Sequence, residues 1–420
     1  MALHFPIVSW AIGASIYEVN IRQYTTEGTI KSFQNNLLRL KEMGITILWF
    51  MPLTPISKEK RQGSLGSYYA CSAYTKVNDE FGTAEDFKEL VNQAHALGLK
   101  VIIDWVANHT GFNHEWAITN SDWFIKDEHG NFTEKNGWID VIDLDYTNIN
   151  MRSAMINAMQ YWINEFDIDG FRCDMAHLVP LSFWYEARKH CDVIKELFWL
   201  AECDEDEYLN VFDANYAWQL MHISENYCKQ KSTLNQIKDL LSTYNGLPTN
   251  TYKLLFTSNH DENSWNGTEY EKYGDAAKAF AVLSCTFKGI SLLYSGQENP
   301  NLKRLAFFEK DTIQWNKTFL LEQFYTKLLN LRKNKAISQG QTNFISISNN
   351  NILVYIRKYE ENIVIVLLNL SQENKVKFML EHEWLSGNFK NLFSDFEFSF
   401  NYTSNFELQA YEARVYVKIN

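Results

Sequence analysis

Short apolar runs alternate with longer segments that carry apolar residues at helical spacing through roughly the first hundred residues. Gly44 is a natural helix end, and Thr83 is a predicted N-cap because acidic residues follow it. The predicted elements, in order, are a strand at 15–23, a helix at 29–44, a strand at 45–52, a helix at 82–98 and a strand at 100–106. Near-continuously apolar strands that alternate with helices predict a parallel sheet covered by helices.

The alternation stops at 108–148, a stretch rich in Trp, Asn and Asp, and resumes with a predicted helix at 151–166. Further strands are predicted at 168–174, 197–202, 211–218, 253–259 and 290–296. Eight strands in βα units favour an α/β fold of the closed (β/α)8 TIM barrel type. A doubly wound open sheet is the weaker alternative, because no Gly-rich phosphate turn follows the first strand.

Beyond about residue 338 the apolar positions recur at every second residue, which indicates strands. These strands are predicted at 343–347, 352–359, 362–370, 376–380 and 413–419. The expected organisation is therefore a barrel from 1–107 and 149–337, a short inserted excursion at 108–148 after the third strand, and a small C-terminal all-β sandwich at 338–420.

Composition restricts the partners and the compartment of the chain. Its 420 residues are 46% hydrophobic, enough for a large core, and the net charge of −12 gives no electrostatic footprint for nucleic acid or an anionic membrane. Six cysteines without Cys-x-x-Cys spacing indicate reduced thiols. No signal peptide or membrane span is recognised, so we expect a cytoplasmic protein, or a periplasmic or secreted one if a leader was removed.

The stretch "GFRCDMAH", at 170–177, places two charges in a predicted buried strand. Side chains alternate along a strand, so Arg172 and Asp174 share one face. Taken alone, Arg-x-Asp is explained most simply by a structural ion pair, and the alternative is a site in which Arg172 keeps a carboxylate ionised.

Polar residues also end three other predicted strands. Each has a structural explanation, such as a helix cap, a satisfied core histidine or an Asx turn, but those explanations do not account for four strand ends together. The residues are Asp104, Asn108, His109, Glu202, His260 and Asp261. Neighbouring residues on a strand point in opposite directions. In each of the pairs Asn108–His109 and His260–Asp261, one residue must therefore lie beyond the end of its strand if both are to reach the same ligand.

Carboxylates that meet over one barrel mouth suit glycoside hydrolysis, in which one attacks the anomeric carbon and another protonates the leaving oxygen. Asp174 is the better nucleophile candidate, because Arg172 on the same face favours its anion. Glu202 has no neighbouring cation in the sequence, and the charge of Asp174 should raise its pKa toward that of a general acid.

The segments "DWVANH", "GFRCDMAH", "WLAE" and "FTSNHDEN" resemble, in order and spacing, the four short motifs of the α-amylase family, glycoside hydrolase family thirteen. The segment "SLGSYYACSAYTKVNDEFGTAEDFKELV" also resembles the part that follows that family's second strand. The resemblance therefore covers nearly the whole chain.

The resemblance implies a role for each matching residue. Asp174 matches the nucleophile, Glu202 the general acid/base, and Asp261 the carboxylate that stabilises the transition state. The resemblance implies substrate-binding roles for Arg172, His109, His260 and Tyr69, on whose ring the sugar would stack. Weaker candidates for outer sugar subsites are Trp116, Trp123 and Trp138 of the excursion.

The chain also departs from the family pattern. Ala73 stands where the family usually has Asp, and Leu178 stands where it usually has His, with His177 one place early. Asn108 and Asp143 match two ligands of the calcium that many relatives bind. The resemblance thus implies no cofactor for the chemistry and, at most, a structural calcium.

The implied function is retaining hydrolysis of α-1,4 links in starch-like glucans or maltooligosaccharides. The alternatives are an α-1,6-active, cyclodextrin-opening or glucan-transferring enzyme of the same family, and an inactive carbohydrate-binding or partner subunit. Inactive relatives lose the carboxylates, whereas Asp174, Glu202 and Asp261 are all present. The oligomeric state is open.

Overall fold

The computed structural model describes residues 5–248, 250–316 and 318–419. Eight parallel strands form a closed barrel in the order β1-β10-β9-β8-β7-β6-β3-β2, which confirms the predicted fold class. Their bounds are β1 Ser15–Val19, β2 Ile47–Phe50, β3 Lys100–Trp105, β6 Gly170–Cys173, β7 Phe198–Ala201, β8 Ala214–Tyr216, β9 Tyr252–Leu255 and β10 Ile290–Tyr294.

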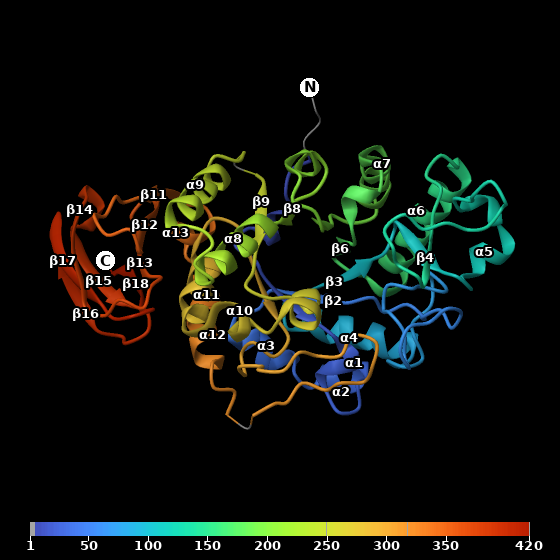
Figure 1. Cartoon of the computed structure of the whole chain (residues 1–420), viewed down its shortest axis with the longest axis horizontal. Coiled ribbons are helices and arrows are strands. Elements are labelled where there is room, and N and C mark those ends of the chain that lie inside the picture. Colours follow the sequence, from blue (N-terminus) through green and yellow to red (C-terminus); the bar gives the residue numbers. More distant parts are fainter. Residues whose placement is uncertain (1–4, 249, 317, 420) are drawn as a thin grey trace.

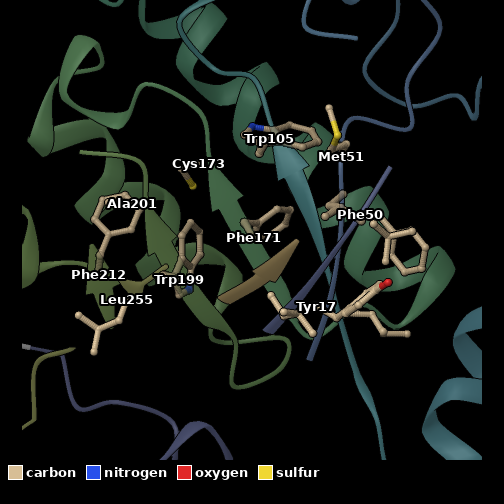
Figure 2. Close-up of a cluster of buried hydrophobic side chains, with 14 of the residues drawn as sticks. Tyr17, Phe50, Met51, Trp105, Phe171, Cys173, Trp199, Ala201, Phe212 and Leu255 are labelled. Carbon is tan, nitrogen blue, oxygen red and sulfur yellow. The ribbon is translucent and has the colours of Figure 1, made fainter. Parts of the chain in front are cut away.

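Alternate residues of each barrel strand face two separate cores. Ile102 and Leu200 belong to the cluster inside the barrel, whereas Trp105, Phe171 and Trp199 belong to the cluster between the strands and the helices. Figure 2 shows this outer cluster, with Phe171 on one strand between Trp105 and Trp199 on its neighbours. The outward residues are thus apolar, and the inward positions remain for Arg172 and its partners.

The helices surround the barrel (Figure 1). They are α1 Ile21–Tyr24, α2 Ile30–Gln34, α3 Leu37–Met43, α4 Ala84–Ala96, α5 Glu115–Thr119, α6 Ile149–Phe166, α7 Leu181–Cys191, α8 Trp218–Cys228, α9 Leu234–Asn245, α10 Glu269–Tyr273, α11 Ala277–Thr286, α12 Glu322–Leu331 and α13 Lys335–Ser338. As predicted, Thr83 caps α4, in a capping box with Asp86. The predicted helix at 29–44 is two helices, because Asn35 and Asn36, residues that favour turns, interrupt it.

The excursion after β3 contains the short antiparallel pair β4 His109–Gly111 and β5 Val141–Asp143. Residues after α13 form a six-stranded sheet in the order β11-β12-β13-β18-β15-β16, and a two-stranded sheet β14-β17. Their bounds are β11 Gln341–Phe344, β12 Ile352–Tyr359, β13 Asn362–Asn369, β14 Val376–Glu381, β15 Gly387–Asn391, β16 Glu397–Phe400, β17 Thr403–Leu408 and β18 Ala413–Ile419. Residues inside these two sheets make a third apolar cluster, as expected of a sandwich.

The C-terminal sheets and the β4–β5 excursion lie at opposite ends of the long axis of the molecule, with the barrel between them (Figure 1). Of these two parts, the excursion is the one that lies close to the end of β3. Its residues can therefore lie beside the polar residues at the ends of the barrel strands. Within the described residues, the helices are too short or too polar to span a membrane.

Candidate active site

Arg172 lies inside the barrel, fully buried, and connects two carboxylates from neighbouring strands. Its Nη1 is 2.8 Å from Asp104 Oδ1 and 2.9 Å from Asp174 Oδ1. β3 and β6 are paired with Asp104 opposite Arg172, which brings the first contact into register. The Nε of Arg172 also donates to the hydroxyl of Tyr216 at 3.1 Å. The guanidinium is therefore held by three side chains, as a buried charge requires.

Arg172 has a further partner that the sequence did not predict. Its Nη2 lies 2.7 Å from Glu202 Oε2, and the backbone N–H of Met175 donates to the same oxygen at 2.8 Å. Glu202 therefore has no neighbouring cation in the sequence but has one in the fold. The reason is that β6 and β7 are adjacent parallel strands, so the residues at their ends meet although they are far apart in the chain.

The pKa of Asp174 is raised well above its usual value. Burial is the largest cause, the negative charge of Glu202 adds to it, and Arg172 acts in the opposite direction without cancelling either effect. Arg172 favours the anion of Asp174, as expected, but removal from water outweighs the effect of one shared guanidinium.

His260 and Asp261 both lie beyond the end of β9, which lets both reach the same region. The Nδ1 of His260 is 2.5 Å from Glu18 Oε1, and its Nε2 is 3.3 Å from Asp261 Oδ2. Burial lowers the pKa of His260, but the carboxylates of Asp261 and Glu18 outweigh it and raise the pKa to about 9. His260 is thus a cation at neutral pH, held between two acids.

Tyr69 stands over the buried charges. Its hydroxyl is 2.6 Å from His260 Nε2 and 3.1 Å from Asp104 Oδ2. The ring stacks on the His260 ring at 5.5 Å and lies nearly parallel to Phe307 at 6.2 Å. These contacts fix the ring plane, as a platform for a sugar requires.

His109 is the first residue of β4, and Asn108 lies in the bend before it. Burial lowers the pKa of His109 to about 4, so its imidazole is neutral at neutral pH. The Nδ2 of Asn108 is 3.2 Å from its Nδ1, and the ring of Trp138 is 5.1 Å away. A neutral imidazole in this position is suited to hydrogen bonding with a hydroxyl.

Some of these residues border a cleft of about 510 Å³. The cleft is lined by Gln62, Ser67, Tyr69, His109, Gly137, Trp138, Ile139, Asp140, Val141, Asp174, Met175, Glu202, Asp261, Trp265, Phe307 and Phe308. Arg172 and His260 are not among the lining residues and act from beneath them. The cleft therefore brings together all three predicted carboxylates with Tyr69 and His109.

The aromatic residues around the cleft differ in part from the prediction. Trp138 lines it, but Trp116 and Trp123 pack against each other at 5.1 Å and against the main core. Trp265 and Phe307 form an aromatic wall, with ring centroids 5.3 Å apart. Sequence reasoning missed this wall, because no motif marks Trp265 or Phe307 and only the loops after β9 and β10 bring them together.

The residues predicted to hold calcium give a mixed fit. Asn108 and Asp143 are both buried, and Asp143 Oδ1 has no hydrogen-bond partner among the described residues. Burial also raises the pKa of Asp143 to about 6. However, the described part of the chain contains no group of three or more His, Cys, Asp and Glu side chains that could hold a metal ion. Asn108 and Asp143 could supply two oxygens to a cation, with the remainder from backbone carbonyls or water.

Residues 16–328 match the family model of the alpha amylase catalytic domain, and residues 342–415 match that of the maltogenic amylase C-terminal domain. The chain belongs to the α-amylase family of glycoside hydrolases. The structure superposes with a TM-score of 0.90 on a noncanonic maltogenic alpha-amylase from Thermotoga neapolitana, at 30% identity over 98% of this chain and 100% of that one. An alpha-amylase from Lactobacillus plantarum gives 0.88 at 28% identity, with coverage of 98% and 100%.

Two curated relatives share less sequence with this member of the α-amylase family. An alpha-amylase of Haloarcula japonica is 25% identical over 87% of this chain, and the chain spans only 56% of that protein's length. A maltogenic alpha-amylase of Bacillus acidopullulyticus is 24% identical over 92% of this chain and 70% of its own length.

Proposed function

We propose that this chain is a retaining glycosidase that cleaves α-1,4 links in starch-like glucans or maltooligosaccharides. The observation that supports this most strongly is the single guanidinium of Arg172, which lies 2.9 Å from Asp174 and 2.7 Å from Glu202. Two carboxylates that share one guanidinium are close together, as in retaining enzymes, where the separation is about 5 Å.

Asp174 attacks the anomeric carbon and forms a glycosyl ester, while Glu202 gives a proton to the departing oxygen. Glu202 then takes a proton from water, whose oxygen attacks the anomeric carbon from the side that the leaving group occupied, and the bond to Asp174 breaks to release its carboxylate. Asp261 is the most exposed of the three, with 36% of its side chain accessible, and is placed to bind sugar hydroxyls. Tyr69 supports the ring, and His109 offers a neutral hydrogen-bonding group.

Bond preference is tested by product analysis on maltoheptaose, pullulan and a cyclodextrin. We expect fast cleavage of maltoheptaose. Faster hydrolysis of pullulan would favour the α-1,6 alternative. Faster opening of the cyclodextrin would favour the activity named for a cyclomaltodextrinase relative, which is 24% identical over 82% of this chain. Products longer than the substrate would favour glucan transfer. No turnover of any of the three would favour an inactive binding subunit.

The cysteines support a cytoplasmic location. All six are free thiols, and five of them are buried. Free thiols persist in a reducing compartment, whereas an oxidising one favours disulfides.

A further inference from the structure

A second cavity of the described chain is larger than the catalytic cleft. It is a groove of about 820 Å³ between the barrel and the C-terminal sheets. Its walls come from α8, α9 and α10 on the barrel side, and from the turns at 350–351, 370–373 and 411 on the other. The two cavities have no lining residue in common, so this groove is a separate place on the molecule.

Three half-buried tyrosines give the groove its aromatic surface: Tyr227 of α8, Tyr270 of α10, and Tyr411 in the turn between β17 and β18. The hydroxyl of Tyr227 donates to Asn351 Oδ1 at 3.2 Å across the junction of the two domains. The backbone N–H of Tyr411 donates to the Ser371 carbonyl at 3.0 Å, which fixes the turn that carries its ring.

The remaining lining argues against an anionic or an apolar ligand. Both lysines that border the groove in the described chain are already paired, Lys272 with Glu262 at 2.7 Å and Lys229 with Glu225, so neither is available to bind an anion. The other walls are mainly amides, hydroxyls and acids, including Asn235, Gln372 and Glu373. An apolar ligand would leave these polar groups without partners.

A neutral ligand with many hydroxyls matches both the tyrosine rings and the polar side chains of this groove. Sugar rings stack on tyrosine faces, and their hydroxyls bond to amides and carboxylates. We propose that this groove is a second binding site for the α-glucan on which the catalytic cleft acts, holding a segment of several glucose units. The inference rests on the proposed function, because that function supplies the identity of the glucan.

The test uses hydrogen exchange of the full chain carrying Glu202→Gln, so that maltoheptaose binds without being cleaved. We expect maltoheptaose to slow exchange in cleft segments and also in 227–235, 270–275 and 370–373. Protection of the cleft alone overturns this inference and leaves the proposed function standing. Protection of neither region overturns both.

Matched variants of Tyr411 test the aromatic contact. In the Glu202→Gln chain, Tyr411→Ala should weaken binding at the groove at least fivefold, whereas Tyr411→Phe, which keeps the ring, should stay within twofold. Turnover of maltotriose, measured with Glu202 intact, should stay within twofold in both variants. Unchanged groove affinity in Tyr411→Ala would overturn the assignment, and if that variant does not fold, the exchange experiment decides.

Discussion

Arg172 Nη2 lies 2.7 Å from Glu202 Oε2, slightly closer than the 2.9 Å between Arg172 Nη1 and Asp174 Oδ1. One buried cation thus holds two carboxylates that we assign to different chemical roles. It also holds Asp104, from a third strand. The positions of the proposed nucleophile and the proposed acid are therefore coupled through one side chain that does not itself line the cleft.

Arg172→Lys should lower kcat/KM by on the order of 100-fold or more, because an ammonium cannot span two carboxylates as a guanidinium does. Steady-state kinetics on maltoheptaose, with the melting temperature of the same variant, would measure this. The matched control is Arg188→Lys, which alters a buried arginine 2.9 Å from Asp213 and outside the cleft. The control should lose stability but keep kcat/KM within threefold. An equal loss of activity in both variants would show that the effect on catalysis is not specific to Arg172.

The His260 cation should make stability depend on pH. Its pKa is about 9 in the folded chain, above the value of about 6.5 expected on unfolding, so the folded state binds the proton more tightly. This stabilisation is fully present below about pH 6.5 and is lost as the pH rises through about 9. It should be on the order of a few kcal/mol. Urea unfolding at several pH values should show a steeper decline for the wild-type chain than for His260→Gln, and equal slopes would show that His260 is neutral in the fold.

Trp138→Ala should raise KM for maltoheptaose several-fold with little loss of stability, because its ring lines the cleft and contacts His109. Trp116→Ala is the matched control. Trp116 packs on Tyr74 at 4.8 Å, so its removal should lower the melting temperature and leave KM nearly unchanged. The opposite pattern would place the outer sugar subsite at Trp116.

Removal of calcium should lower the melting temperature little or not at all. Asn108 and Asp143 supply few ligands, and a site that binds weakly stabilises the fold weakly. Thermal unfolding with and without a chelator measures the effect. A decrease of tens of degrees that calcium reverses would show that backbone carbonyls and water complete a strong site.

Much of the fold could be predicted from the sequence, because the apolar periods of strands and helices differ. The third strand was predicted at 100–106 and found at Lys100–Trp105. The 15–23 strand was predicted too long, since α1 begins at Ile21 with Asn20 at its N-cap position. β15, β16 and β17 were missed because each carries at most two apolar side chains, too few to reveal a period of two.

The site was predictable where a strand end carries a motif, and not where the arrangement depends on neighbours across the barrel. Asp174 and Glu202 each follow a strand, but their shared contact with Arg172 depends on which strands are adjacent. Glu18, on β1, binds His260 from 242 residues away, and no local pattern marks it. Likewise, the Trp265–Phe307 wall requires the folded loops.

The assignment of Asp174 as nucleophile and Glu202 as acid/base is tested most directly by azide rescue with an α-glucosyl fluoride, whose leaving group needs little protonation. In Glu202→Ala, the covalent intermediate on Asp174 should accumulate, and azide, which needs no base, should attack it and give the α-glycosyl azide. In Asp174→Ala, azide must attack the substrate directly and give the β-azide. Proton NMR distinguishes the two anomers, and a β-azide from the Glu202 variant or an α-azide from the Asp174 variant would contradict the assignment.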